Sequence, residues 1–145
     1  LEVEVSRNSK FVLKVCCSKL NDEETAIIFD SKKNILKIDT TRSTLDKNVF
    51  RPDVMARYQG KQSDVPVQEA PFRLESDELL NLRVFLDRSI LEVFSNNRQA
   101  ITQRIYPINR DSKNIDVRSI GGSSKIVRLD LWQMRPSNLG MVNSR

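Results

Sequence analysis

The sequence predicts an all-β domain, built as an antiparallel two-sheet β-sandwich of the jelly-roll or concanavalin-like type. Apolar and polar residues alternate with a period of two along most of the chain, which is typical of strands that face a core on one side. The alternating runs are short, and turn-forming residues separate them without a sustained helical stripe. With 145 residues, 39% of them hydrophobic, the chain suits one domain with an ordinary core. We expect that domain to span 1–136 and a disordered or added tail to span 137–145.

Each expected strand is a short β-rich run that ends at a turn. The alternation is clearest at the start, where Leu1, Val3 and Val5 are separated by glutamates. Turns are indicated between the runs by Asn-Asp, Asp-Ser, Asn-Asn and Gly-Gly pairs. The expected strands are 1–5, 11–15, 25–30, 35–40, 82–87, 90–94, 99–106, 115–120 and 125–134.

Two segments interrupt this rhythm. Residues 41–71 alternate only weakly and include Pro52, Pro66 and Pro71, so this stretch is functional, docked on the domain, or contains strands that the pattern hides. Residues 76–82 favour a short helical turn, with Ser76 as its cap and two acidic residues behind it.

The composition excludes several classes of function. The chain has no histidine, which excludes Ser-His-Asp catalysis, Cys-His catalysis and imidazole metal sites. No apolar run approaches the roughly 18 residues that cross a bilayer, so we expect no membrane partner. Acidic and basic residues are interleaved to a net charge of +5, which together with dispersed aromatics predicts no nucleic-acid partner.

Two adjacent cysteines, Cys16 and Cys17, lie in a β-rich run. Neighbouring residues of a strand point to opposite faces, so we expect one of them in the core and the other facing outward. A disulfide between neighbours would be strained, and a metal site would lack other soft ligands. Both are therefore interpreted as packing residues.

The run over 82–94 predicts a hairpin with a two-residue turn at Arg88-Ser89. That turn pairs Asp87 with Ile90 and Phe85 with Glu92. The core face then carries Leu82, Val84, Leu86, Leu91 and Val93. The opposite face carries Arg83, Phe85, Asp87, Ile90, Glu92 and Phe94. Aromatic residues among charges indicate a surface that docks against another domain or a ligand.

Asp87 and Glu92 form the best candidate carboxylate pair, as diagonal neighbours across the hairpin. Glycosidases use two carboxylates about 5–10 Å apart, but nothing in the sequence indicates a deep pocket that would raise a pKa. The same spacing suits salt bridges with Arg83, Arg88 or Arg104. It also suits hydrogen bonds to sugar hydroxyls.

The position of Arg104 depends on the loop after the hairpin. With a two-residue turn at Asn96-Asn97, Glu92 pairs with Ile101 and Arg104 falls on the opposite face. A three-residue loop with a bulge would bring Arg104 back beside the carboxylates.

The last expected strand repeats the pattern of the hairpin. We expect Val127, Leu129 and Leu131 in the core, with Arg128, Asp130 and Trp132 on the other face. Trp132 is either a stacking platform for a sugar or a half-buried packing residue.

Two neighbouring runs carry a resemblance to a known family. Residues 82–94 contain Leu-Asp-Arg-Ser-Ile-Leu-Glu-Val-Phe, and residues 98–107 contain Thr-Gln-Arg-Ile-Tyr-Pro. Segments 24–30, 38–43 and 130–134 agree with further strands of the same module. Over 1–136 the chain resembles the C-terminal β-sandwich of glycoside hydrolase family 32, which includes invertases, levanases and inulinases. It is also similar to a related family of fructan-binding modules.

The resemblance implies a non-catalytic accessory module of a β-fructofuranosidase-type hydrolase. In that family, an N-terminal five-bladed β-propeller holds the nucleophile in Trp-Met-Asn-Asp-Pro-Asn-Gly, the transition-state stabiliser in Arg-Asp-Pro and the acid/base in Glu-Cys. This chain contains none of these motifs. We therefore expect no catalytic residue, no metal ligand and no cofactor in it.

The resemblance implies three roles: packing on the catalytic propeller, contacts in a homo-oligomer, and binding of fructan or sucrose-type carbohydrate. A structural or oligomerisation domain that binds no sugar is the alternative. For carbohydrate binding it implies Asp87, Arg88, Glu92 and Arg104, with Asp39 and Arg42 as neighbours and Trp132 as a platform. Polymer-degrading members of the family favour a secreted or periplasmic location over the cytoplasm.

Overall fold

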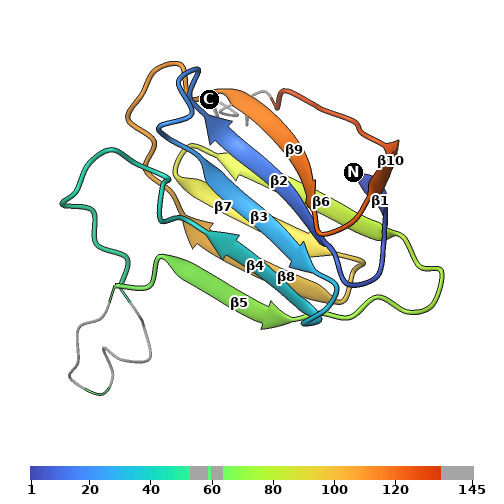
Figure 1. Ribbon diagram of the computed structural model, residues 1–145. Coiled ribbons are helices and arrows are strands. Elements are labelled where there is room, and N and C mark those ends of the chain that lie inside the picture. The colour runs from blue at the N-terminus through green and yellow to red at the C-terminus, as the bar shows by residue number, and fades with distance from the viewer. Residues whose placement is uncertain (53–58, 60–63, 135–145) are drawn as a thin grey trace, which may run out of the picture.

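Figure 1 shows a computed structural model of the chain, which describes residues 1–52, 59 and 64–134. The described residues form two five-stranded antiparallel sheets that face each other, as the sequence predicts. One sheet contains, in spatial order, β10 (Ser124–Arg128), β1 (Glu2–Val5), β6 (Leu80–Asp87), β7 (Ile90–Ser95) and β8 (Gln99–Arg104). The other contains β5 (Val67–Pro71), β4 (Ile35–Asp39), β3 (Thr25–Asp30), β2 (Lys10–Cys17) and β9 (Asn114–Ile120).

The core lies between the two sheets, because every second residue of each strand points inward. Its fully buried members come from both sheets and include Val3, Phe11, Ile27, Phe29, Leu36, Ile38, Leu80, Leu82, Leu91, Val93 and Ile105. Phe72, directly after β5, closes one side with its ring 5.6 Å from Phe29 in an edge-to-face pair. The guanidinium of Arg98 lies 5.5 Å from the Phe72 ring.

All nine expected strands are confirmed, and β5 is the strand that the pattern hides within 41–71. β5 pairs with β4 from Val67 opposite Asp39 to Pro71 opposite Ile35. It is an edge strand, where a proline costs no ladder hydrogen bond on the open side. The prolines are the reason that the sequence pattern did not indicate this strand. β8 and β10 also end earlier than expected, at Arg104 and Arg128.

The expected helical turn over 76–82 is wrong. Residues 75–78 form a tight turn in which the amide of Glu78 donates to the carbonyl of Glu75, and Asp77 has a φ of 60°. Leu80 and Asn81 pair with β1, and the residues from Leu82 onward pair with β7, so strand pairing overrides the local capping signal. Pro136 and the expected tail over 137–145 lie outside the described residues. Among the residues that are described, none belongs to a helix that could cross a bilayer.

Both cysteines are buried, so neither thiol is open to solvent, but only Cys16 belongs to the core cluster, in keeping with the expectation of one core cysteine. Lys14 pairs with Asp116, but Cys17 pairs with Asn114, which leaves one extra residue on β2. Cys16 takes the positive φ of 51° that accompanies this bulge. The bulge breaks the alternation: Cys16 joins the core cluster, whereas Cys17 is covered on the side of β2 that carries the charged groups of Lys14, Glu24 and Asp116.

Four residues expected in the core are exposed: Leu86, Val127, Leu129 and Leu131. Leu86 lies in the half of β6 that β1 does not reach, because β1 pairs with only the first residues of β6. The other three lie in or just after β10, which forms the edge of its sheet and ends at Arg128. At Leu86 the exposure follows from a missing neighbour, whereas Val127 is the extra residue of a bulge, because Val3 pairs with Ile126 and Glu2 with Arg128.

Candidate functional site

The hairpin of β6 and β7 has the predicted register. Arg88 and Ser89 form the two-residue turn, Asp87 pairs with Ile90, and Phe85 pairs with Glu92. Arg88 has a positive φ of 53° and Ser89 does not, which is the pattern of a type II′ turn and not of a type I′ turn. Leu82, Leu91 and Val93 consequently point into the core, and their neighbours point outward.

The loop after the hairpin has three residues, so the second of the two registers is the correct one. Ser95 pairs with Gln99, which leaves Asn96, Asn97 and Arg98 in the loop. Both asparagines have positive φ values, 47° and 54°. The register shifts by one residue, so that Ile90 pairs with Arg104 and Glu92 with Thr102.

These pairings bring three of the predicted site residues onto one surface. We define the β6–β8 outer face as Arg83, Phe85, Asp87, Ile90, Glu92, Phe94, Thr102 and Arg104. Its apolar members, Phe85, Ile90 and Phe94, are between 37% and 42% exposed. The two phenylalanine rings pack edge to face, with centroids 5.9 Å apart.

The charged groups of this face have no partner within the described part of the chain. Asp87, Glu92 and Arg104 make no side-chain hydrogen bond or ion pair with another described residue. The salt bridges with Arg83, Arg88 or Arg104 that the sequence allows are therefore not formed there. Arg88 itself lies exposed in the turn next to Asp87. The free charges leave hydrogen-bonding capacity for an external group.

Asp39 and Arg42 do not join this surface. Asp39 lies on the outer face of the other sheet, where it pairs with Ala26 of β3. Its carboxylate accepts hydrogen bonds from the amide and hydroxyl of Thr41, at 3.0 and 2.6 Å. The core separates that face from the β6–β8 outer face, so the candidate residues fall into two groups.

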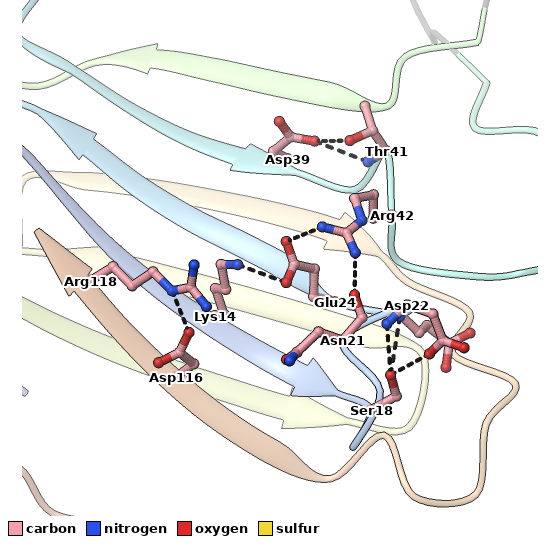
Figure 2. A network of polar contacts seen from close by, with 11 residues as sticks. Lys14, Ser18, Asn21, Asp22, Glu24, Asp39, Thr41, Arg42, Asp116 and Arg118 are labelled. Atoms are coloured by element: carbon pink, nitrogen blue, oxygen red, sulfur yellow. Dashed lines mark hydrogen bonds and ion pairs between the residues drawn. The ribbon is translucent and has the colours of Figure 1, made fainter. Parts of the chain in front are cut away.

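Arg42 belongs to the polar network in Figure 2. Glu24 is buried and bridges two cations, Lys14 at 2.7 Å and Arg42 at 3.1 Å. Arg42 also donates to the carbonyl of Asn21, which leaves this network largely satisfied by itself. It ties the start of β3 to β2 and to the segment after β4.

Trp132 is 79% exposed and lies in the irregular segment after β10. Its predicted half-buried packing is not observed. No strand pairing joins the segment after β10 to β6 among the described residues, so Trp132 is not part of the β6–β8 outer face.

The sequence reasoning missed Glu23, the most enclosed carboxylate among the described residues. Its side chain is fully buried, at one end of the sandwich. It accepts hydrogen bonds from the amides of Leu45, Ile108 and Asn109 at 3.2, 2.9 and 3.0 Å, and from the hydroxyl of Ser112 at 2.5 Å. The donors come from loops that are distant from Glu23 in the sequence, so no local sequence pattern predicts that Glu23 accepts their hydrogen bonds. Glu23 holds those loops together.

The buried thiols are unsuited to nucleophilic chemistry. Burial raises the pKa of Cys16 to about 11, and the neighbouring Cys17 and Glu23 reinforce the shift. The thiolate is thus scarce at neutral pH. Within the described ranges, no group of three or more His, Cys, Asp or Glu side chains is arranged to hold a metal ion.

Comparisons with known proteins agree on one family. The family model described as glycosyl hydrolases family 32 C terminal matches residues 1–133. The chain is 28% identical to a fructan 6-exohydrolase of Triticum aestivum, over 93% of this chain and 22% of that protein. It is 26% identical to an extracellular exo-inulinase of Aspergillus awamori, over 89% of this chain and 22% of that protein.

A solved structure supports the same fold. The crystal structure of the exo-inulinase from Aspergillus awamori matches with a TM-score of 0.66 and 22% identity, over 86% of this chain and 22% of that one. The chain thus spans about a fifth of the length of these relatives. Because the family model covers nearly all of the β-sandwich, the chain belongs to the family of C-terminal domains of family 32 glycosyl hydrolases.

Proposed function

We propose that the chain is the non-catalytic accessory module of a β-fructosidase-type hydrolase, and that the β6–β8 outer face packs on the catalytic β-propeller of the parent protein. One observation carries this proposal: half-exposed apolar side chains lie on that face among charges that have no partner in the described chain. A second domain would cover the apolar groups and supply the missing counter-charges.

The contrast between the two outer faces supports the choice of surface. On the outer face of the other sheet, acidic groups are paired, as in Lys10–Asp30 at 3.3 Å and Asp116–Arg118 at 2.7 Å. Such pairs are typical of a surface that is complete in water. Between described residues, the β6–β8 outer face has no such pair, and it carries the Phe85–Phe94 pair instead.

The test uses one double variant, Phe85→Ser/Phe94→Ser. It is made in two proteins, this chain and the full-length parent. In this chain both rings are already partly exposed, so the free energy of unfolding should change little. In the parent, loss of the apolar contact should shorten the half-life of activity at elevated temperature several-fold. Ile120→Ser is the matched control, since Ile120 is an exposed apolar residue on the outer face of the other sheet. Equal half-lives for all three parent proteins would contradict docking through this face.

Sugar binding on the same face is the second candidate function. It is favoured by Asp87, Glu92 and Arg104, whose free oxygens and N–H groups suit vicinal sugar hydroxyls. An aromatic ring next to such groups suits the apolar face of a sugar. The two functions compete, because a face covered by a propeller is closed to a polymer.

Calorimetric titration of this chain with levan, inulin, sucrose and fructose tests sugar binding directly. A saturable heat that disappears in Asp87→Ala/Glu92→Ala would support it. The control Asp46→Ala/Glu69→Ala removes one exposed aspartate and one exposed glutamate elsewhere and should retain the signal. Silence with all four sugars, from a sample whose circular dichroism shows a folded chain, would exclude this role and leave docking.

A further inference from the structure

β6 has an open edge along its second half. β1 pairs with β6 only at its start, with Glu2 opposite Asn81 and Val3 opposite Leu80. Leu1 extends this ladder by two hydrogen bonds with Leu82, at 3.0 and 2.9 Å. From Arg83 to Asp87, no strand of the described chain lies on this side of β6.

The directions of the backbone groups show which of them are unpaired. In an antiparallel ladder, successive residues direct their N–H and C=O groups to opposite sides of the strand. The two-residue turn makes Asp87 and Ile90 a hydrogen-bonded pair, so Phe85 and Asp87 bond to β7. Leu82 bonds to Leu1 on the other side, and Val84 and Leu86 point the same way. Their N–H and C=O groups therefore form a template for a further strand.

The same gap has a second border in residues 129–134. β10 and β6 are both antiparallel to β1, so they run in the same direction. Arg128, the last residue of β10, is level with Glu2, and the chain then continues past the level of Leu1. Figure 1 shows this segment leaving β10 close to the N-terminus. Apolar side chains in it, Leu129, Leu131, Trp132 and Met134, are all exposed.

We propose that this gap binds an extended segment of the parent protein that continues β1 on its N-terminal side. The proposal rests on the proposed function, in which the chain is one module of a longer hydrolase. The added strand runs antiparallel to β6, with the residue before Leu1 opposite Arg83 and roughly five residues reaching Asp87. It bonds to Val84 and Leu86 on one side and to residues 129–134 on the other.

Continuity with β1 favours this occupant over a second copy of the chain. The segment would extend an existing ladder without a new loop, so little chain entropy opposes it. Its alternate residues opposite Val84 and Leu86 would face the core and cover Leu86. The inward positions therefore continue the series of Val5, Val3 and Leu1 and should be apolar.

Amide hydrogen exchange at single residues tests the proposal in two proteins, this chain and the full-length parent. In this chain, Val84 and Leu86 should exchange fast, and Phe85 and Asp87 slowly, because only the latter bond to β7. In the parent, Val84 and Leu86 should slow by roughly a hundredfold or more, and Phe85 and Asp87 serve as the internal control.

Two results would overturn the proposal. Fast exchange of Val84 and Leu86 in both proteins would show an edge that stays open. Protection in this chain that rises with its concentration would identify a second copy as the occupant. Fructan hydrolysis by the parent is measured on the same sample. If the parent hydrolyses fructan but Val84 and Leu86 still exchange fast in it, only the added strand is contradicted. If these amides are protected but the parent does not hydrolyse fructan, only the proposed function is contradicted.

Discussion

At the scale of single residues, Glu23 is the side chain on which the loop end of the sandwich depends. Replacing it by alanine leaves three amides and one hydroxyl without their acceptor in a buried site. We expect Glu23→Ala to lower the free energy of unfolding by about 3 kcal/mol. Urea unfolding measures the loss. For Glu69→Ala, at an exposed position of β5, the free energy of unfolding should stay within about 0.5 kcal/mol of that of the unsubstituted chain. Equal losses for both variants would show that the loops do not depend on Glu23.

Glu78 gives the sandwich a defined sensitivity to acid. Hydrogen bonds from Arg98, at 2.6 and 2.8 Å, and from the amide of Glu75 lower its pKa from 4.5 to about 2. A carboxyl whose pKa is lower in the folded state contributes stability above pH 4.5, and this contribution is lost as the pH falls toward 2. In Glu78→Gln, the free energy of unfolding should therefore decline less between pH 5 and 2 than in the unsubstituted chain. Parallel pH profiles would contradict this linkage.

At the scale of elements, the loop between β7 and β8 sets the register of the candidate site. Asn96 is fixed there by bonds to Asn81, Glu78 and Leu79, whereas Asn97 only has to adopt a φ of 54°. Asn97→Gly should match or slightly raise the stability, and Asn97→Ala should lower it by about 1 kcal/mol. Thermal unfolding measured on both variants tests this. The same Tm for glycine and alanine would mean that the loop imposes no positive φ.

The hairpin was predictable from sequence because alternation and a two-residue turn both fixed one register. The following loop was not, since Asn-Asn suits a two-residue turn as well as a three-residue loop, and a single residue decides the side of Arg104. β5 was hidden because its prolines are permitted only by its edge position. The sequence pattern therefore predicted that Asp87 and Glu92 share a surface. It did not predict that Asp39 and Arg42 lie on the other sheet.

At the scale of the whole molecule, the two outer faces of the sandwich have different electrostatic characters. Lys14, Glu24 and Arg42 form a closed network on one face, where burial makes their pairing necessary. On the other face, Asp87, Glu92 and Arg104 form no ion pair with a described residue, and an aromatic pair is half-exposed. The asymmetry supports the proposal that this face contacts another domain or a sugar.

The two cysteines report on the cooperativity of the whole fold. Both are buried in β2, which lies between β3 and β9, and burial raises the pKa of each thiol. Native chain should therefore react with a thiol-specific disulfide reagent on the order of a thousandfold more slowly than chain unfolded in urea, because access requires opening of the central strands. Single-thiol variants Cys16→Ser and Cys17→Ser assign the rates. If one thiol reacted as fast in native buffer as in urea, that side chain would be open to solvent, which would contradict its burial in the folded chain.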